Sequence, residues 1–156
     1  MTMSQLLQLW LTAMRPKTLT AAVSPVLLGM SLAFQSGFFK PFTAIMTLLA
    51  AVFIQIGTNL ANDVFDFEKG ADTDDRLGPM RVTLAGLLTP EQVKQGMVYC
   101  FSFALFIGFY LAWIGGYPIV LIGSTAILAG MAYSGGPYPL GYNGLGDLFV
   151  FIFFGL

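Results

Sequence analysis

Four polar residues near the middle of the chain have the types and spacing to bind a cation: Asn59, Asn62, Asp63 and Asp66. They lie at i, i+3, i+4 and i+7, so a helix places them on one face. The segment before them is almost wholly apolar, and we interpret it as a membrane span from which this polar face emerges. A charge inside a bilayer costs roughly 2.5–3.5 kcal/mol, and two carboxylates ~6 Å apart repel by about 3 kcal/mol at an effective dielectric of about 20. A bound divalent cation would offset both costs.

The available ligands indicate which cation this is. The chain has no histidine, and its single cysteine, Cys100, lies in a separate apolar segment. Asp63, Asp66 and Asp72 therefore offer oxygen alone, which suits a hard ion such as Mg²⁺. Three bases are interleaved with the acids: Lys69, Arg76 and Arg81. A site that holds Mg²⁺ together with a phosphorylated ligand would use both kinds of charge.

A solvated loop whose charges only set topology is the alternative interpretation. We favour it for the remaining charges of this region: Glu68, Asp74, Asp75, Glu91 and Lys94. For Asp72, Arg76 and Arg81 both interpretations stay open. A second loop, rich in glycine and proline, contributes three tyrosines: Tyr133, Tyr138 and Tyr142. We favour interfacial anchoring for Tyr142, whereas Tyr133 could equally face a reactive centre.

The composition is that of a multi-pass membrane protein. Of the 156 residues 56% are hydrophobic and 10% are charged, whereas a soluble domain carries about a quarter charged residues. The formal net charge is −1, and we expect no nucleic-acid partner. The expected surroundings are the lipid bilayer.

The sequence predicts an all-α, multi-pass transmembrane helical bundle with four full spans and the start of a fifth. The expected spans are residues 18–34, 42–61, 97–113, 119–133 and, beginning the fifth, 148–156. A short amphipathic helix at residues 3–14 is expected to lie at the interface. Because the fifth span stops after nine residues, we expect residues 1–156 to be the N-terminal part of a single domain, truncated at the C-terminus.

The distribution of basic residues predicts the orientation. With four spans, the N-terminus and both loops described above share one side, which carries six bases: Arg15, Lys17, Lys69, Arg76, Arg81 and Lys94. The other side carries Lys40. The positive-inside rule places the six on the cytoplasmic side of the inner membrane.

The run NLANDVFDFEKGADTDDRLGPMR, residues 59–81, resembles the first aspartate-rich motif of the UbiA superfamily of intramembrane prenyltransferases. Its N-x-x-N-D-x-x-D-x-x-x-G-x-D form is similar to that of the branch that acts on 1,4-dihydroxy-2-naphthoate in menaquinone synthesis. MRPKTLTAAVSPVLLG and YSGGPYPLGYNGLG also resemble that branch. The resemblance covers the whole chain but about half of a nine-helix UbiA-type fold.

The resemblance implies roles for individual residues. Asp63, Asp66 and Asp72 would hold Mg²⁺, although Gly70 stands where ubiquinone-type members carry their third acid. The diphosphate would be bound by five side chains: Asn59, Asn62, Lys69, Arg76 and Arg81. Tyr133 matches a family tyrosine near the reacting atoms, and with Asp63 and Asp66 it completes the expected catalytic set.

The implied reaction transfers a polyprenyl group from polyprenyl diphosphate to 1,4-dihydroxy-2-naphthoate and gives demethylmenaquinone. Because the family's second aspartate-rich motif is expected beyond Leu156, we expect the fragment to be inactive without the C-terminal half of the same protein. Another aromatic acceptor, of the 4-hydroxybenzoate or homogentisate type, is an alternative.

Non-enzymatic alternatives are a membrane transporter or channel segment and a non-catalytic half that pairs with another chain. A transporter would accommodate a polar stripe in one span, but no second intramembrane charge supplies a pathway.

A lipid-phosphate alcohol transferase, an enzymatic alternative, also clusters aspartates, but its D-G-x-x-A-R signature is missing from the sequence.

Overall fold

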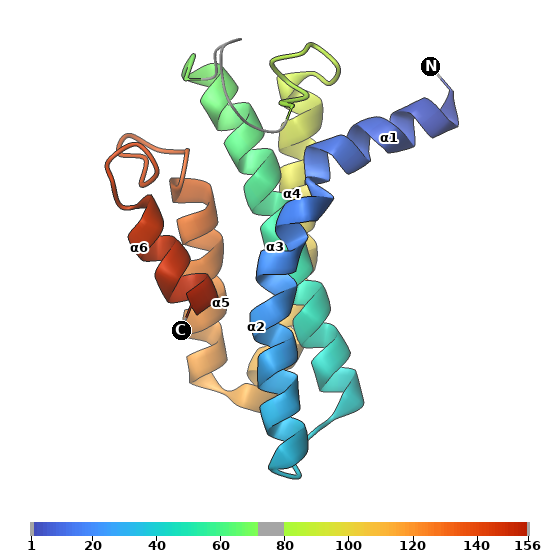
Figure 1. The fold of residues 1–156 in the computed structure, drawn as a ribbon, viewed down its shortest axis with the longest axis vertical. Coiled ribbons are helices and arrows are strands. Elements are labelled where there is room, and N and C mark those ends of the chain that lie inside the picture. The colour runs from blue at the N-terminus through green and yellow to red at the C-terminus, as the bar shows by residue number, and fades with distance from the viewer. Residues whose placement is uncertain (1, 72–79, 156) are drawn as a thin grey trace.

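The structure is a computed structural model that describes residues 2–71 and 80–155, and these residues form helices joined by turns (Figure 1). The elements in chain order are α1 (Met3–Met14), α2 (Pro16–Gln35), α3 (Pro41–Glu68), α4 (Pro90–Gly115), α5 (Tyr117–Ala132) and α6 (Gly146–Val150), which continues as a π-helical segment (Phe151–Gly155). Among these described residues there is no strand, and the predicted all-α class is confirmed.

Local sequence explains where several helices begin. Thr2 accepts a hydrogen bond from the backbone of Gln5 and caps α1, and Thr89 caps α4 in the same way through Gln92. Proline stands in the first turn of α2, α3, α4 and α5, where its missing N–H has no helical partner to lose. Gly116, with φ of 71°, separates α4 from α5 in a conformation that disfavours other residues.

Three of the four predicted full spans, α2, α3 and α4, are long and apolar enough to cross a membrane. The predicted fourth span, α5, is an apolar helix of 16 residues. At 1.5 Å per residue it covers about 24 Å, less than the ~30 Å hydrocarbon thickness. α3 continues seven residues beyond the predicted span, to Glu68, so the polar face is the last part of one continuous helix.

The bundle is organised around α3, which packs against α1, α2, α4 and α5. Figure 1 shows the N-terminus, the end of α3, the start of α4 and the loop between α5 and α6 at one end of the molecule, and the α2–α3 and α4–α5 turns at the other. The described segments that flank the acidic loop therefore lie at the same end of the molecule as the α5–α6 loop, as predicted. α1 runs away from the bundle at a steep angle at that same end.

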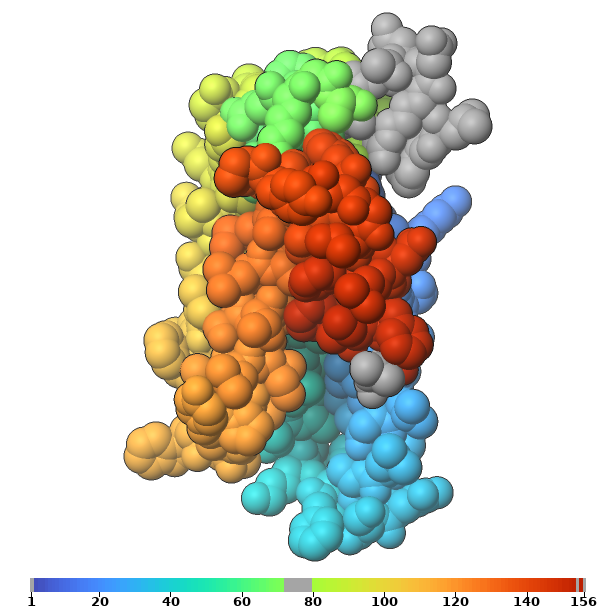
Figure 2. Space-filling model, turned by 90° about the vertical axis from the view of Figure 1, so that its left-hand side faces the viewer, coloured from blue at the N-terminus to red at the C-terminus, as the bar shows by residue number. Residues whose placement is uncertain are grey.

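The buried core also lies toward this end. Its fully buried side chains include Leu60 and Val64 of α3, Val82 of the following segment and Val93 of α4. Figure 2 shows the α5–α6 loop and α6 as one continuous surface directly beneath the end of α3. The end that carries the polar residues therefore also holds most of the buried core.

Candidate active site

The polar stripe of α3 is buried. Asn59, Asp63 and Asp66 keep 4%, 0% and 7% of their surface exposed, and each is hydrogen-bonded to residues outside α3. Because buried polar groups are costly unless they are hydrogen-bonded, their partners indicate what each residue does.

Asp63 holds the backbone of a turn that follows the acidic loop. Its Oδ2 accepts a hydrogen bond from the N–H of Val82, and its Oδ1 accepts one from the N–H of Thr83, both at 3.1 Å. This turn, residues 81–87, closes on itself through hydrogen bonds from Ala85 to Arg81 and from Leu87 to Val82. Asp63 therefore fixes the segment from which Arg81 projects, which we call the Arg81 turn.

Asp66 lies between two side chains from distant segments. Arg81 Nη2 donates to its Oδ2 in a buried ion pair, and the Tyr142 hydroxyl donates to its Oδ1. Arg81 thus contacts Asp66 directly, and its predicted role in diphosphate binding stays a prediction. Tyr142 remains half-exposed, at 49%.

Asn59 faces the other way, toward the junction of α1 and α2. Its Nδ2 donates to the carbonyl of Met14 at 2.9 Å and to Thr18 Oγ1 at 2.8 Å. The amide therefore ties α3 to the junction on which Arg15, with φ of 51°, redirects the chain. Its predicted role in diphosphate binding stays a prediction.

Asn62 and Lys69 hold the α5–α6 loop, residues 133–145. Ser134 donates its hydroxyl to Asn62 Oδ1 at 3.1 Å. Lys69 Nζ donates to the carbonyls of Ser134 and Gly136 at 2.6 and 2.8 Å, and it lies 5.7 Å from the centre of the Tyr142 ring. These carbonyls follow the end of α5, where a cation is favourable. Two of the three Lys69 donors are thus bound to this loop.

Tyr133 is enclosed by Gly141 of the same loop and by Gly146 at the start of α6. A Cβ added at Gly141 would lie 2.9 Å from its ring, and one added at Gly146 would lie 3.0 Å from its hydroxyl oxygen. The predicted ligands Asp72 and Arg76 lie outside the described residues.

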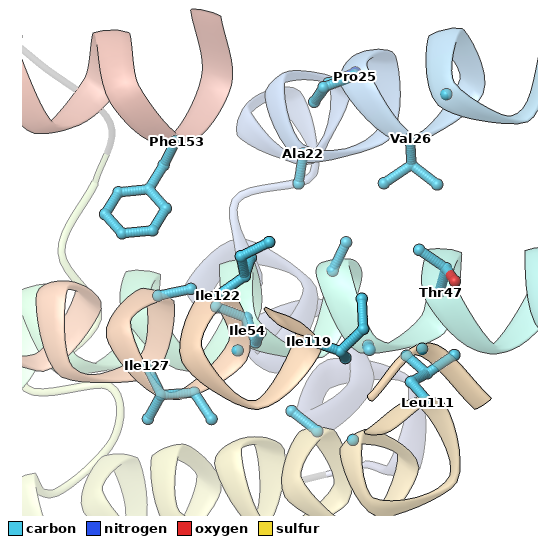
Figure 3. Close-up of a pocket in the computed structure, with 18 of the residues that line it drawn as sticks. Ala22, Pro25, Val26, Thr47, Ile54, Leu111, Ile119, Ile122, Ile127 and Phe153 are labelled. Atoms are coloured by element: carbon cyan, nitrogen blue, oxygen red, sulfur yellow. The ribbon is translucent and has the colours of Figure 1, made fainter. Parts of the chain in front are cut away.

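A cavity of about 920 Å³ extends from Tyr133 along the bundle, and its lining is mostly apolar (Figure 3). α2, α3, α4, α5 and the last described segment all contribute to it, as Ala22, Ile54, Leu111, Ile127 and Phe153 illustrate. Gln55 and Thr58 of α3 also line the cavity. Asn62 follows Thr58 by four residues on the same helix, about 6 Å along its axis, so the polar stripe begins where the cavity ends.

The contacts allow the predicted Mg²⁺ site to be tested for fit. Both oxygens of Asp63 accept backbone N–H groups inside a closed core, which suits a structural cap better than an ion ligand. Asp66 fits an ion better, because the partner of its Oδ1 is a neutral, half-exposed hydroxyl. Asn62 presents an oxygen four residues earlier. Within residues 2–71 and 80–155 no three carboxylate, cysteine or histidine side chains form a metal-binding group.

Two site residues were not predicted from the sequence. Ser134 was not singled out, and Tyr142 was interpreted as an interfacial anchor. Tyr142 is half-exposed, as an anchor would be, but its hydroxyl reaches Asp66. The available signal was that Tyr142 shares a loop with Tyr133 on the same side as the acids.

Comparison with known proteins places the chain in a family. Residues 22–156 match the UbiA prenyltransferase family. The chain therefore belongs to the UbiA prenyltransferase family, and the predicted resemblance is confirmed.

Among its relatives, the 1,4-dihydroxy-2-naphthoate octaprenyltransferases of Escherichia coli (strain K12) and Mycobacterium tuberculosis (strain H37Rv) are each 36% identical, over 95% and 94% of this chain and 50% of each relative. The 2-carboxy-1,4-naphthoquinone phytyltransferase of Synechocystis is 33% identical over 95% of this chain and 48% of the relative. The chain spans about half the length of these curated relatives. No solved structure gives a significant match.

Proposed function

We propose that the protein carrying this chain transfers a polyprenyl group from polyprenyl diphosphate to 1,4-dihydroxy-2-naphthoate. The observation that carries the proposal is the continuity of the apolar cavity with the polar stripe along one helix, from Gln55 and Thr58 to Asn62 and Asp66. A polyprenyl tail needs a long apolar cavity, and its diphosphate needs a charged site at the end of that cavity.

The proposed ion site consists of Asp66 and Asn62, with Mg²⁺ as the ion and Asp72 as a further predicted ligand. A bound Mg²⁺ would stabilise the negative charge that develops on the departing diphosphate. Arg81 supplies a second positive charge beside Asp66, at a position that Asp63 fixes through the Arg81 turn. Lys69 retains one donor beyond its two loop carbonyls.

The reaction breaks the allylic C–O bond of the diphosphate and forms a C–C bond to the acceptor ring, whose carboxyl group leaves as CO₂. The allylic cation that forms when diphosphate leaves must be kept from water, and the mostly apolar lining of the cavity favours this. Tyr133 lines the cavity at the end nearest the stripe and could stabilise that cation through its ring face.

The acceptor is inferred from the relatives, whose names specify 1,4-dihydroxy-2-naphthoate or 2-carboxy-1,4-naphthoquinone. The decisive experiment supplies membranes containing the protein, as its full reading frame encodes it, with labelled polyprenyl diphosphate and three acceptors. We expect transfer to 1,4-dihydroxy-2-naphthoate and little to 4-hydroxybenzoate or homogentisate. Transfer mainly to either of the latter would overturn the acceptor, and no transfer to any would overturn the activity.

We also propose that residues 1–156 act as part of a longer single domain and do not turn over by themselves. This rests on the half-length match to the relatives. Purified residues 1–156 should show no transfer under conditions in which the longer protein is active. Turnover by this fragment would contradict the proposal.

The proposed orientation puts the active-site end on the cytoplasmic side of the inner membrane. Tyr138 in the α5–α6 loop is exposed, and so is Phe38 at the opposite end. Single cysteines placed as Tyr138→Cys and Phe38→Cys, in a background without other reactive cysteines, should react with an impermeant maleimide from the cytoplasmic and the opposite side respectively. The reverse pattern would invert the topology.

A further inference from the structure

The side chain of Tyr142 occupies the one carboxylate oxygen of Asp66 that Arg81 does not use. Arg81 donates to Oδ2 and Tyr142 donates to Oδ1. A hydroxyl hydrogen directed at Oδ1 places a partial positive charge where a cation bound to that oxygen would lie. Tyr142 and a cation at this position therefore compete for the same lone pair.

The loop that carries Tyr142 lies along the polar stripe and is held there at three points. Asn62, Asp66 and Lys69 are spaced at i, i+4 and i+7 on α3, and each contacts the loop. Asn62 and Lys69 bind its first part, at Ser134 and Gly136, without using a carboxylate. Of the three contacts, the one made by Tyr142 is the contact with a carboxylate, that of Asp66.

The two partners of Asp66 differ in how readily they can leave. The ion pair with Arg81 is buried, with side-chain exposures of 4% and 9%, and a buried charge left alone is costly. Tyr142 is neutral and 49% exposed, so water can replace Asp66 as its partner. A cation arriving at Asp66 would therefore displace Tyr142 and leave Arg81 in place.

We propose that Tyr142 is a positioning residue that holds Asp66 until a divalent cation displaces it, so that loading of the ion releases the part of the loop around Tyr138 and Tyr142. This inference rests on the proposed function, because it takes Asp66 as an ion ligand. The loop remains attached through Ser134 and Gly136, and backbone hydrogen bonds from Leu140 to Ala132 and from Gly141 to Tyr133 also hold it to the end of α5, so the movement is confined to Tyr142 and its neighbours. Tyr142 thus links ion binding to the opening of the site.

The test is a titration of the purified full-length protein with Mn²⁺, followed by the electron paramagnetic resonance signal of the free ion. Tyr142→Phe removes the competing hydroxyl and keeps the ring near Lys69, so it should bind Mn²⁺ roughly two- to tenfold more tightly, the range of one net hydrogen bond. Tyr138→Phe, in the same exposed loop, is the matched control and should bind as the wild type does. Asp66→Asn should lose the binding. A gain in affinity is a result that structural damage would not produce.

Each outcome separates the two proposals. If Asp66→Asn loses Mn²⁺ but Tyr142→Phe binds with wild-type or weaker affinity, the role of Tyr142 is overturned and the proposed ion site stands. If Asp66→Asn binds Mn²⁺ as the wild type does, the ion site is overturned, and the role of Tyr142 with it.

A second measurement follows the loop directly. A maleimide should label Tyr138→Cys faster when Mn²⁺ is added, and combining this variant with Tyr142→Phe should give fast labelling without the ion. Cys100, buried in α4, serves as the internal reference for unchanged labelling. Labelling of Tyr138→Cys that ignores Mn²⁺ would overturn the proposed coupling.

Discussion

Asp66 and Arg81 form a buried ion pair across 15 positions of sequence, between the end of a membrane helix and a turn beyond the acidic loop. The pair fixes the guanidinium group of Arg81 beside the polar stripe of α3. The pair also connects the two ends of the aspartate-rich motif, residues 59–81. Asp66 lies in the helical first part of this motif, and Arg81 is its last residue.

The first prediction concerns the stability of this pair. Arg81→Met leaves Asp66 buried without its cationic partner and should lower the free energy of unfolding by about 3–5 kcal/mol. Thermal or denaturant unfolding in detergent measures the change. Lys94→Met, which removes an exposed pair with Glu68, is the control and should cost less than about 1 kcal/mol.

A double variant separates charge burial from simple loss of packing. Asp66→Leu combined with Arg81→Met removes both charges and should be more stable than Arg81→Met alone. If the losses of unfolding free energy in Asp66→Leu and Arg81→Met add up to the loss in the double variant, the two charges are not coupled.

The second prediction concerns Asp63. Asp63 accepts the N–H groups of Val82 and Thr83, one on each carboxylate oxygen. In Asp63→Asn the amide has one oxygen for one of these donors, and its NH₂ group faces the second donor. The variant should therefore lose about 1–3 kcal/mol of unfolding free energy. The loss should appear in EDTA, because it does not depend on an ion. The exposed Asp147→Asn is the control. Wild-type stability in EDTA together with lost Mn²⁺ binding would instead make Asp63 a ligand.

The third prediction concerns the close approach of α3 and α5. A Cβ at Gly130 would lie 2.3 Å from Thr58 Oγ1, so Gly130→Ala should destabilise the protein by about 1–3 kcal/mol. Gly123→Ala, on the same helix with open space around it, should be neutral or stabilising. Adding Thr58→Ala to Gly130→Ala should recover part of the loss, and no recovery would show that the clash lies elsewhere.

The fourth prediction concerns the length of the prenyl chain. Gly29 and Gly123 line the cavity, and no other residue lies within 4 Å of a Cβ added there. Gly123→Leu should therefore fill part of the cavity and raise KM for long polyprenyl diphosphates more than for short ones. Leu128→Phe, at an exposed position on the same helix, should change neither KM. Equal effects on long and short substrates would place the tail outside this cavity.

The periodicity of the sequence predicted the helical polar face correctly, because the spacing of Asn59, Asn62, Asp63 and Asp66 is a local property of one helix. The periodicity could not predict which residues these side chains contact. Asn59 contacts residues 41 and 45 positions away, and Tyr142 lies 76 positions from Asp66. Such pairs depend on how the helices pack.

Differences in helix length have a similar origin. Hydropathy ended the second span near the first polar residues, whereas α3 continues to Glu68 because tertiary partners satisfy Asp63 and Asp66. The path of the α5–α6 loop depends on positive φ values at Gly136 and Gly144. Its glycine content indicates such turns but not which helix face they bring Tyr142 to.

The central claim is that Asp66 and a divalent cation bind the diphosphate of an isoprenoid substrate at the end of the cavity. Titration calorimetry of the full-length protein with a polyprenyl diphosphate, in Mg²⁺ and in EDTA, tests it most directly. We predict binding in Mg²⁺ that is lost in EDTA and in Asp66→Asn. Equal affinity with and without the ion, or in Asp66→Asn and the wild type, would contradict the claim.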